Sequence, residues 1–525
     1  MKPFADLVDR LLYSPSHNAK LALLFDYFAR TPDPDRGLGL AILTGNLDLK
    51  HFRLAALRKL AERRVDPVLF RLSYDFVGDL AETVALIWPD GSSNQPWPRL
   101  ADVHRQLIDA PKTDLPDLIA GWLDTLDATG RWALLKLLTG NMRVGISGRL
   151  AKLALAKMGR VEASEVEEVW HGIKLPYEDL FGWLEGRVAR PNVDDHPLFR
   201  PLMLANSLSE KGLRHLDLSE YAVEWKWDGV RVQLSARAGE RRLYSRSGDD
   251  ISHAFPEIIE AMSFDGVLDG ELLLLQGRGV ASFNELQHRL NRKRITPRAL
   301  KEHPAHVWLY DLLFDGLEDL RGQSYEARRG RLEAFFDRVV PERMDLSPLI
   351  AVKGFPSLAI LHESCRERGL EGLMLKRRKS VYVAGRPAGS WYKWKRDPLT
   401  LDTVLMYAQR GHGARSSLYS DFTLGAWCVG EEGRELVPVG KTNLGFTNKE
   451  LRMLDKWVRD HTVQRFGPVR EVKKILVIEA AFDSVCKSSR HKSGISMRFP
   501  RLHRIRWDKS AEEADELGAL RSWLK

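Results

Sequence analysis

The hydrophobic pattern of this chain changes its period once, near residue 195, and this change limits the folds that the chain can adopt. Before that point apolar residues recur at intervals of three and four, as in 19–29 and 148–157, which is typical of amphipathic helices. After a polar, proline-bearing stretch at 190–197, short segments alternate apolar and polar residues, as strands do. The pattern predicts a multidomain α+β protein, with an all-α N-terminal domain over 1–195 and an α+β domain over 205–398.

The last part of the chain, 399–525, is rich in predicted strands. One amphipathic helix is expected over 447–461. The strand candidates around it are 402–410, 423–430, 436–440 and 474–482. Several strands with one helix are typical of a small barrel, so we expect a C-terminal OB-fold β-barrel.

The net charge of +9 indicates a polyanionic partner only weakly, but its distribution is more informative. Eight Lys or Arg residues and one acid, Asp508, lie between Lys487 and Lys509. Phosphate backbones or polyphosphates are the natural ligands of such a cluster. Its eight cations are Lys487, Arg490, Lys492, Arg498, Arg501, Arg504, Arg506 and Lys509.

Several features indicate a cytoplasmic protein without a membrane partner. The three cysteines, Cys365, Cys428 and Cys486, are far apart and odd in number, so neither a disulfide framework nor a cysteine zinc site is expected. The N-terminus lacks an apolar signal region, and no apolar run is long enough to cross a bilayer.

One strand-like segment begins Glu224-Trp225-Lys226-Trp227-Asp228-Gly. On a strand its acids and lysine share one face, and its two tryptophans share the other. Because burying an unpaired charge is costly, we expect the tryptophans to anchor the strand in a core while Lys226 points into a cleft. Taken alone, the segment is either the site of a nucleophilic lysine or, more commonly, a surface strand with ordinary ion pairs.

A nucleophilic lysine needs particular neighbours. Its reference pKa is near 10.4, so roughly one lysine in a few thousand is neutral at pH 7, and cations or burial must lower that pKa. A phosphoryl substrate also needs cations for its oxygens and acids for a divalent metal ion. The chain supplies candidates for these needs in Arg231, Arg246, Asp269, Glu271, Tyr310, Glu371, Lys376, Lys393 and Lys395.

Each candidate also has a purely structural interpretation. The Asp-Gly-Glu of 269–271 is more often a surface turn, Tyr310 is more often a core residue, and the lysines of 391–395 are typical of a protected sheet edge. Strict alternation places Glu371 and Lys376 on opposite faces of a strand. If both serve one site, a bulge or a strand end must intervene.

Taken in order, six motifs resemble motifs I, Ia, III, IIIa, IV and V of the covalent nucleotidyltransferases. They are Lys226-Trp-Asp-Gly, Tyr244-Ser-Arg246-Ser-Gly, Asp269-Gly-Glu271, Tyr310-Asp-Leu-Leu-Phe314, Glu371-Gly-Leu-Met-Leu-Lys376 and Trp391-Tyr-Lys393-Trp-Lys395. That superfamily contains ATP-dependent DNA ligases, RNA ligases and mRNA-capping guanylyltransferases. The segment from Arg498 to Lys509 resembles motif VI of DNA ligases, and Leu138-Thr-Gly-Asn-Met-Arg143 resembles part of the helical DNA-binding domain of replicative-type ATP-dependent ligases.

The resemblance to an ATP-dependent DNA ligase therefore spans nearly the whole chain. It implies a helical DNA-binding domain over 1–195, an ATP-grasp-like nucleotidyltransferase (adenylation) domain over 205–398 and an OB-fold domain over 399–525. It further implies that Lys226 attacks the α-phosphorus of ATP, that AMP passes from Lys226 to the 5′-phosphate at a nick, and that the 3′-hydroxyl then displaces AMP.

The resemblance also implies a role for each motif residue. Glu224 contacts the adenine, largely through its backbone, and Tyr310 lies under the base. Glu271 and Glu371 hold Mg²⁺ or Mn²⁺, and Glu271 also serves the ribose. The expected ribose and phosphate ligands are Arg231, Arg246, Lys376, Lys393, Lys395 and, at a looser offset, Arg386.

The implied substrates are ATP and nicked double-stranded DNA. We expect a monomer, bound to nucleoid DNA in the cytoplasm, that works in replication, repair or recombination with DNA-repair proteins as partners. Some motif VI cations are expected to orient the pyrophosphate in the first step only.

Two other functions are compatible with some of these features. The core motifs also suit an RNA ligase or a capping guanylyltransferase, although the helical N-terminal domain and Arg-Phe-Pro-Arg of motif VI favour a DNA ligase. A non-enzymatic nick-binding protein is the second alternative, and the intact set of lysines and acids argues against it. An NAD-dependent ligase is not expected, because the cysteine cluster of its zinc module is absent.

Overall fold

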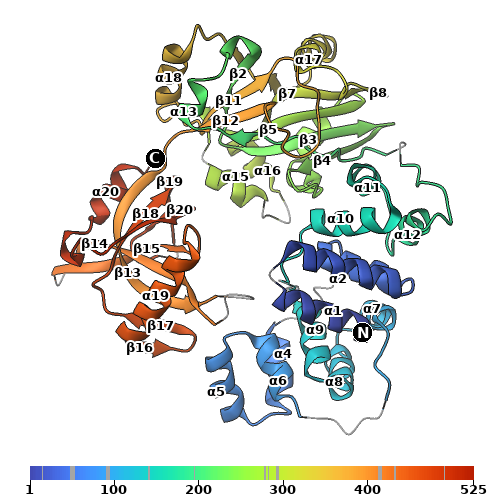
Figure 1. Ribbon diagram of the computed structural model, residues 1–525, viewed down its shortest axis with the longest axis vertical. Coiled ribbons are helices and arrows are strands. Elements are labelled where there is room, and N and C mark those ends of the chain that lie inside the picture. Colours follow the sequence, from blue (N-terminus) through green and yellow to red (C-terminus); the bar gives the residue numbers. More distant parts are fainter. Residues whose placement is uncertain are drawn as a thin grey trace. The chain divides into compact units, whose positions relative to one another are not determined.

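The computed structural model in Figure 1 describes most of the chain. The described residues are 1–14, 16–47, 54–89, 95–139, 142, 144–193, 196–276, 279–281, 283–290, 292, 295–411, 417–430, 433–489 and 491–524. Along the chain a helical part is followed by an α+β part with two sheets and then by a curled β-sheet. This order confirms the expected fold class.

The helical part extends as far as α12, and its elements follow from apolar spacing and caps. Helices α2 and α10 cover the two stretches predicted from the sequence, and Ser16 and Ser147 cap them by accepting backbone N–H groups. The bounds are α1 Lys2–Tyr13, α2 His17–Arg30, α3 Asp35–Thr44, α4 Leu54–Glu62, α5 Pro67–Val77, α6 Leu80–Ile87, α7 Leu100–Asp109, α8 Leu115–Thr125, α9 Ala128–Thr139, α10 Gly148–Gly159, α11 Ala163–Val169 and α12 Glu178–Leu184. Of the Leu138–Arg143 motif, Gly140, Asn141 and Arg143 lie outside the described residues, as do Asp194 and Asp195 of the predicted linker.

The first sheet of the α+β part has the strand order β1-β12-β11-β2-β10. Its strands are β1 Asn206–Ser207, β2 Tyr221–Lys226, β10 Leu349–Ile350, β11 Gly372–Arg377 and β12 Trp391–Lys395. Strands β2 and β11 run antiparallel, with Lys226 opposite Gly372. One face packs on a core that contains Val223, Leu373 and Leu375 together with Leu358 from α18 Phe355–Ser364.

The second sheet has the order β4-β3-β5-β7-β8, with β6 beside β5 and β9 beside β7. Its strands are β3 Val230–Arg237, β4 Glu240–Ser245, β5 Gly266–Gln276, β6 Gly279–Val280, β7 Ala305–Asp315, β8 Glu318–Asp319 and β9 Met344–Leu346. The helices of this part are α13 Glu210–Leu213, α14 Pro256–Ala261, α15 Phe283–Leu290, α16 Pro297–Glu302, α17 Tyr325–Val339 and α18. Side chains of α14, α15 and α17 fill the core of this sheet.

A separate cluster joins the two sheets. Ala222 and Trp391 come from the first sheet, and Val267 and Leu313 come from the second. The two sheets therefore contact each other through buried apolar side chains of β2, β12, β5 and β7.

Helix α11 belongs to the same compact unit as Ala189–Asp397. Its Glu168 is ion-paired with Arg200 at 2.5 Å and with Arg321. The domain boundary at 195 stays a prediction, and Glu162–Ile173 is a stretch on the N-terminal side of it that packs with the α+β part.

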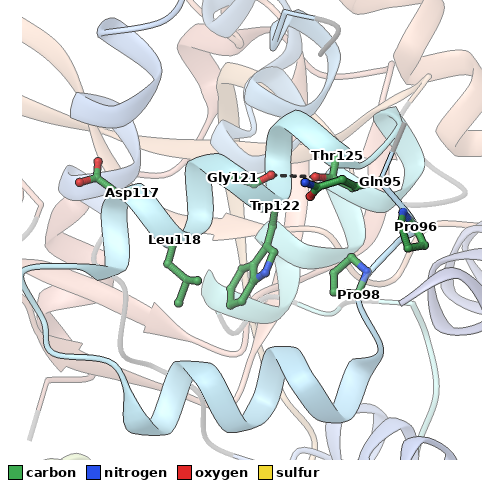
Figure 2. A pocket seen from close by; sticks show the side chains of 8 residues that line it. All are labelled: Gln95, Pro96, Pro98, Asp117, Leu118, Gly121, Trp122 and Thr125. Carbon is green, nitrogen blue, oxygen red and sulfur yellow. Dashed lines mark hydrogen bonds between the residues drawn. The ribbon is translucent and has the colours of Figure 1, made fainter. Parts of the chain in front are cut away.

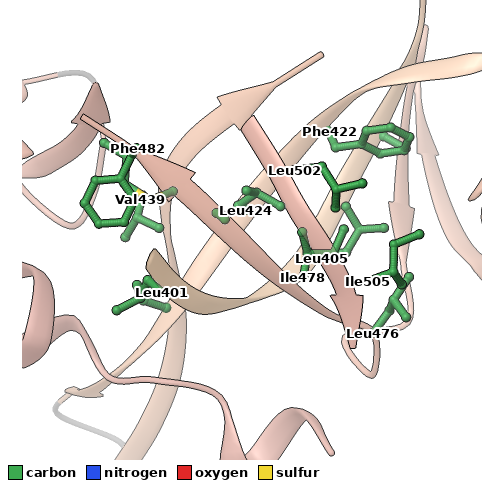
Figure 3. Packing of buried hydrophobic residues seen from close by; sticks show 14 of the residues in the cluster. Leu401, Leu405, Phe422, Leu424, Val439, Leu476, Ile478, Phe482, Leu502 and Ile505 are labelled. Atoms are coloured by element: carbon green, nitrogen blue, oxygen red, sulfur yellow. The ribbon is translucent and has the colours of Figure 1, made fainter. Parts of the chain in front are cut away.

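The C-terminal part is the curled sheet expected for an OB-fold. Strand β13 Leu399–Arg410 pairs with β18 through its first half and with β17 through its second half, so the sheet bends around one core. Figure 3 shows Leu401, Leu405, Phe422 and Ile478 in that core. The remaining elements are β14 Tyr419–Gly430, β15 Gly433–Thr442, α19 Asn448–His461, β16 Thr462–Phe466, β17 Val469–Val472, β18 Val477–Phe482, β19 Ser484–Lys487, β20 Ile495–Arg498, β21 Arg501–Arg506 and α20 Leu517–Ser522.

The predicted helix of this part is confirmed as α19, which begins with a capping box between Thr447 and Glu450. The hairpin of β16 and β17 was not predicted. Most side chains of β16 are exposed, so its sequence lacks the apolar alternation of a half-buried strand.

Candidate active site

The strand that carries Lys226 alternates as predicted. Trp225 and Trp227 pack against the core on one face of the first sheet, together with Val223. Lys226 is at the end of β2 with its side chain 20% exposed. Glu224, which shares the face of Lys226, is only 2% exposed, because two buried side chains described below contact its carboxylate.

Lys226 and Glu371 meet where their two strands end. Lys226 Nζ forms an ion pair with the Glu371 carboxylate, and the Glu371 N–H donates to the Lys226 carbonyl at 2.8 Å. Lys395 Nζ is 3.5 Å from the same carboxylate. Glu371 immediately precedes β11, so the strand end, and not a bulge, releases it from the alternation that would separate it from Lys376.

The glycine after Glu371 is required by this geometry. Gly372 has a φ of +145°, and a Cβ there would lie 2.1 Å from the carbonyl oxygen of Trp394. Because β12 passes so close, only glycine lets β11 begin at this point and leave Glu371 beside Lys226.

Four cations gather around Lys393, on β12. Burial lowers the pKa of Lys393, and the charges of Arg386, Lys395, Lys226 and Arg246 lower it further. Arg246 lies on the exposed turn after β4, and Arg386 on the exposed loop before β12. The fold thus concentrates positive charge from three segments that are far apart in sequence, as a phosphate site needs.

Glu271 brings a second acid to this site from the other sheet. It lies opposite Arg231 on β3 and Trp308 on β7. Burial raises the pKa of Glu271 to about 7, the carboxylates of Glu371 and Asp228 raise it as well, and Lys226 and Arg231 oppose them. Glu271 and Glu371 are therefore both electrostatic neighbours of Lys226.

Arg231 is held by a buried network. Its guanidinium donates to Asp269 Oδ2 at 2.6 Å, to the Met203 carbonyl at 2.6 Å and to the Tyr382 hydroxyl at 3.2 Å. Asp269 is fully buried and also accepts from Tyr382 at 2.6 Å. The surface-turn interpretation of 269–271 is wrong for this chain, because Asp269 orients Arg231 and leaves Glu271 to face the cations.

Lys376 lies beside Glu224. Its Nζ is 2.8 Å from Glu224 Oε1 and 4.2 Å from the centroid of the Tyr310 ring, and its side chain is 2% exposed. Burial lowers the pKa of Lys376, while the neighbouring charges of Glu224 and Asp311 raise it. Tyr310 itself is 9% exposed and lies 5.8 Å from the Arg231 guanidinium carbon.

Comparison with known proteins identifies this arrangement. Residues 202–395 match the ATP dependent DNA ligase domain, and residues 415–509 match the ATP dependent DNA ligase C terminal region. A "Probable DNA ligase" of Koribacter versatilis (strain Ellin345) is 33% identical over 410 residues, which cover 73% of this chain and 70% of that protein. The chain belongs to the ATP-dependent DNA ligase family.

Other members of the family are similar over comparable lengths. The "DNA ligase 1" of Korarchaeum cryptofilum (strain OPF8) is 32% identical over 405 residues, covering 75% of this chain and 72% of that protein. A solved structure named "Pmar-Lig_Pre" superimposes with a TM-score of 0.60 at 18% identity and covers 96% of this chain and 99% of that one. The similarity to this solved structure supports the fold alone. ATP-dependent DNA ligase activity follows for this chain from its membership of the family.

Two acids of this site could hold a divalent cation. Within the described residues no group of three or more His, Cys, Asp or Glu side chains surrounds a single metal position. Mg²⁺ is commonly held by one or two carboxylates, with water and substrate phosphates completing its shell. Glu271 and Glu371 are such a pair, and their mutual repulsion is the cost that a cation would remove.

Among the motif VI cations, Arg498 ends β20 and the others lie on and after β21. Several of them are paired with acids of the same barrel. Arg504 is bound to Glu479 at 3.0 Å and Arg501 to Asp483 at 3.1 Å. Arg506 and Lys509 both reach Asp402, at 3.1 and 2.8 Å. Arg490, the second residue of the predicted cluster, lies outside the described residues.

Sequence reasoning missed Tyr325, Tyr382 and Met203. Their contacts join segments 28 to 151 residues apart, so no local spacing pattern could indicate them. Ser324 was recognisable only as a helix cap, which would have placed Tyr325 at the start of a helix without naming its partner.

A hollow in the helical part is unrelated to these residues. Figure 2 shows it beside α8, where Thr125 donates to the Gly121 carbonyl at 3.0 Å. It is lined by Gln95, Pro96, Pro98, Asp117, Leu118, Gly121, Trp122 and Thr125. No helix among the described residues is long and apolar enough to span a membrane.

Proposed function

We propose that the protein seals nicks in duplex DNA through a lysyl-AMP intermediate on Lys226. The observation that carries this proposal is the position of Lys226, which lies between the cations around Lys393 and the acids Glu271 and Glu371. An amine at this position lies beside positive charges that can bind the oxygens of a triphosphate. Because the family is ATP-dependent, the triphosphate is ATP.

In the first step the Lys226 nitrogen attacks the α-phosphorus of ATP, a P–N bond forms and pyrophosphate leaves. In the second step a 5′-phosphate oxygen at the nick displaces Lys226 and takes the AMP. In the third step the 3′-hydroxyl attacks that phosphate, the phosphodiester bond forms and AMP leaves.

The residues of the site have distinct tasks in these steps. Lys393, Lys395 and Arg386 offset charge on the α-phosphate and leaving groups, and Arg246, on its exposed turn, binds the phosphate of the nick. Arg231, fixed by Asp269, contacts the nucleotide, and Tyr310 supports the adenine. Mg²⁺ or Mn²⁺ held by Glu271 and Glu371 would supply further positive charge against the phosphate oxygens.

Glu371 also prepares the nucleophile. Its ion pair with Lys226 keeps Nζ at the strand end. A metal ion held by Glu371 would draw its carboxylate away from Lys226 and leave Nζ free to attack the α-phosphorus.

The C-terminal barrel and the helical part would bind pyrophosphate and DNA, respectively. Motif VI cations such as Arg501 and Arg504 are paired with barrel acids and would exchange these for pyrophosphate in the first step. The helical part would bind mainly to the phosphate backbone of the duplex, so the affinity for DNA should fall steeply as the salt concentration rises. One chain contains every residue named here, which suits a monomer.

Incubation with Mg²⁺ and α-labelled ATP, followed by denaturing electrophoresis, tests the proposal. The wild-type protein should become labelled without DNA, and nicked duplex should then discharge the label and yield sealed product. Lys226→Ala should abolish labelling, while Lys301→Ala, on the exposed side of α16, should not.

A label that persists in Lys226→Ala would remove the nucleophile assignment. Labelled GTP in place of ATP tests the alternative of a capping guanylyltransferase. A protein that binds nicked DNA but never becomes labelled would be the non-enzymatic alternative.

A further inference from the structure

The carboxylate of Glu224 is held from one side by two buried donors. The Tyr325 hydroxyl donates to Glu224 Oε1 at 2.6 Å, and Lys376 Nζ is 2.8 Å from the same oxygen. Glu224 is 2% exposed, Tyr325 1% and Lys376 2%. Oε2 takes part in neither of these contacts, so the second oxygen keeps its capacity to accept a hydrogen bond.

Tyr325 is fixed more tightly than a helix-surface tyrosine would be. It is the first residue of α17, and its backbone N–H donates to the Ser380 carbonyl at 2.7 Å. Its ring meets Trp391 edge-on, with centroids 6.4 Å apart. The hydroxyl therefore cannot leave Glu224 without moving the start of the helix.

Lys376 is fixed by aromatic rings on three sides. Its Nζ lies 4.2 Å from the Tyr310 centroid, 4.8 Å from that of Trp391 and 5.1 Å from that of Tyr325. A cation in such a cage is stabilised by the ring faces although it is removed from water. The charges that act on Lys376 are Glu224, Asp311 and Arg329, whereas those that act on Lys393 are Arg386, Lys395, Lys226 and Arg246.

The geometry points to a clamp: we propose that Tyr325 and Lys376 together orient Glu224 so that Oε2 selects purines with a 6-amino group. This rests on the proposed binding of adenine beside Tyr310. The 6-amino group of adenine donates to a carboxylate oxygen, whereas O6 of guanine or hypoxanthine is an acceptor and is repelled by it. Tyr325 is then a positioning residue, and Lys376 serves the base end of the site instead of the α-phosphate.

Glu224→Gln gives the sharpest test, because both clamp residues are donors. They should turn the amide so that its oxygen occupies the place of Oε1, which leaves the NH₂ group in the place of Oε2. The site would then donate where the wild type accepts. The ratio of kcat/KM for ATP to that for ITP, measured by Lys226 labelling, should fall on the order of 100-fold.

Tyr325→Phe removes the donor and keeps the ring. The KM for ATP in Lys226 labelling should rise roughly tenfold with kcat within about twofold, and the ATP to ITP ratio should fall. In the Glu224→Gln background it should move the ATP to ITP ratio back toward the wild-type value, because one of the two donors that orient the amide is lost.

Tyr221→Phe is the matched control. It removes another tyrosine hydroxyl from β2, one that donates to the Gly389 carbonyl at 3.0 Å and belongs to the opposite face of the sheet. Its ATP to ITP ratio should equal that of the wild type. Lys376→Met should change this ratio as Tyr325→Phe does, whereas a ligand of the α-phosphate would lower kcat for both nucleotides equally.

The outcomes separate this proposal from the proposed function. If the wild type forms no adduct with ATP, the proposed function fails. If the wild type is labelled and a Tyr325→Phe protein with wild-type thermal unfolding keeps both its KM and its ATP to ITP ratio, the clamp is refuted. A folded Glu224→Gln protein whose ATP to ITP ratio equals that of the wild type would refute it as well.

Discussion

Lys226 and Glu371 are joined twice, once by an ion pair between their side chains and once by a backbone hydrogen bond of 2.8 Å between the ends of their strands. The backbone bond keeps the two residues side by side even when their side chains change partners. The Glu371 carboxylate could therefore pass from Lys226 to a metal ion without any movement of β2 or β11. This arrangement leads to the first prediction.

Glu371→Gln should slow Lys226 labelling by about 100-fold or more, because a neutral amide no longer attracts a divalent cation to the triphosphate. Labelling rates at saturating ATP over a range of Mg²⁺ concentrations measure this effect. Glu363→Gln, on the exposed side of α18, is the control and should label at the wild-type rate. A rate for Glu371→Gln within about threefold of wild type would contradict a metal role for this residue.

Arg328 and Asp311 form a fully buried ion pair in which both carboxylate oxygens accept, at 2.8 and 2.9 Å. Arg328→Met leaves an uncompensated carboxylate in the core, so unfolding in urea should show a loss of about 3–5 kcal/mol. Arg331→Met on the same helix removes a partly exposed pair with Asp315 and should cost less than about 1 kcal/mol. Equal losses in the two variants would mean that burial of the first pair does not decide its contribution.

The raised pKa of Glu271 predicts that the stability of the metal-free protein depends on pH. Burial raises the pKa of Glu271 to about 7 from the ordinary value of 4.5, so between these values the folded protein keeps a proton that the unfolded chain has lost. The free energy of unfolding therefore falls as pH rises through this window. Relative to wild type, Glu271→Gln should gain about 2–3 kcal/mol between pH 4.5 and pH 7, once screening by water is allowed for.

Urea unfolding in EDTA at several pH values measures this difference. Glu260→Gln, at an exposed position of α14, should show no such trend. A flat difference between Glu271→Gln and wild type would mean that the carboxyl group titrates normally.

The exposed position of Arg246 leads us to expect that its substitution affects the first step, labelling of Lys226, much less than the later steps on DNA. Its turn is exposed, so Arg246→Ala should change Lys226 labelling by less than about threefold but weaken binding of nicked duplex and slow discharge of the label. The slope of log affinity against log salt should fall by about one, because one phosphate contact is lost. Arg298→Ala, at an exposed site on α16, should keep the wild-type slope.

Much of the site could be predicted from local patterns, because those patterns have local causes. Alternation placed Trp225 and Trp227 in the core and Lys226 on the other face of β2, and the structure confirms both. The family resemblance then predicted that Arg246, Lys393 and Lys395 lie near that lysine. The charges of Lys226, Lys395 and Arg246 all act on Lys393, so the four residues are close enough to interact.

The exceptions are residues whose surroundings come from distant segments. Alternation placed Glu224 on the same face as Lys226 without indicating that it is buried, and Tyr325, 101 residues further along the chain, contacts its buried carboxylate. Asp269 resembled a surface turn, yet Tyr382, 113 residues away, and Arg231 enclose it. A charged side chain is buried or exposed according to whether partners for it exist, and partners from other strands leave no trace in its own spacing.

The sequence by itself determined the order of the parts, the strand that carries Lys226 and the kind of chemistry that its motifs supply. Those properties depend on periodicity and residue type, which act within a few positions of the chain. Only the tertiary structure decided that Glu371 meets Lys226 at a strand end and that Lys376 pairs with Glu224 beside Tyr310. Both depend on how β2, β11 and the second sheet pack, since packing alone fixes which charges share a buried space.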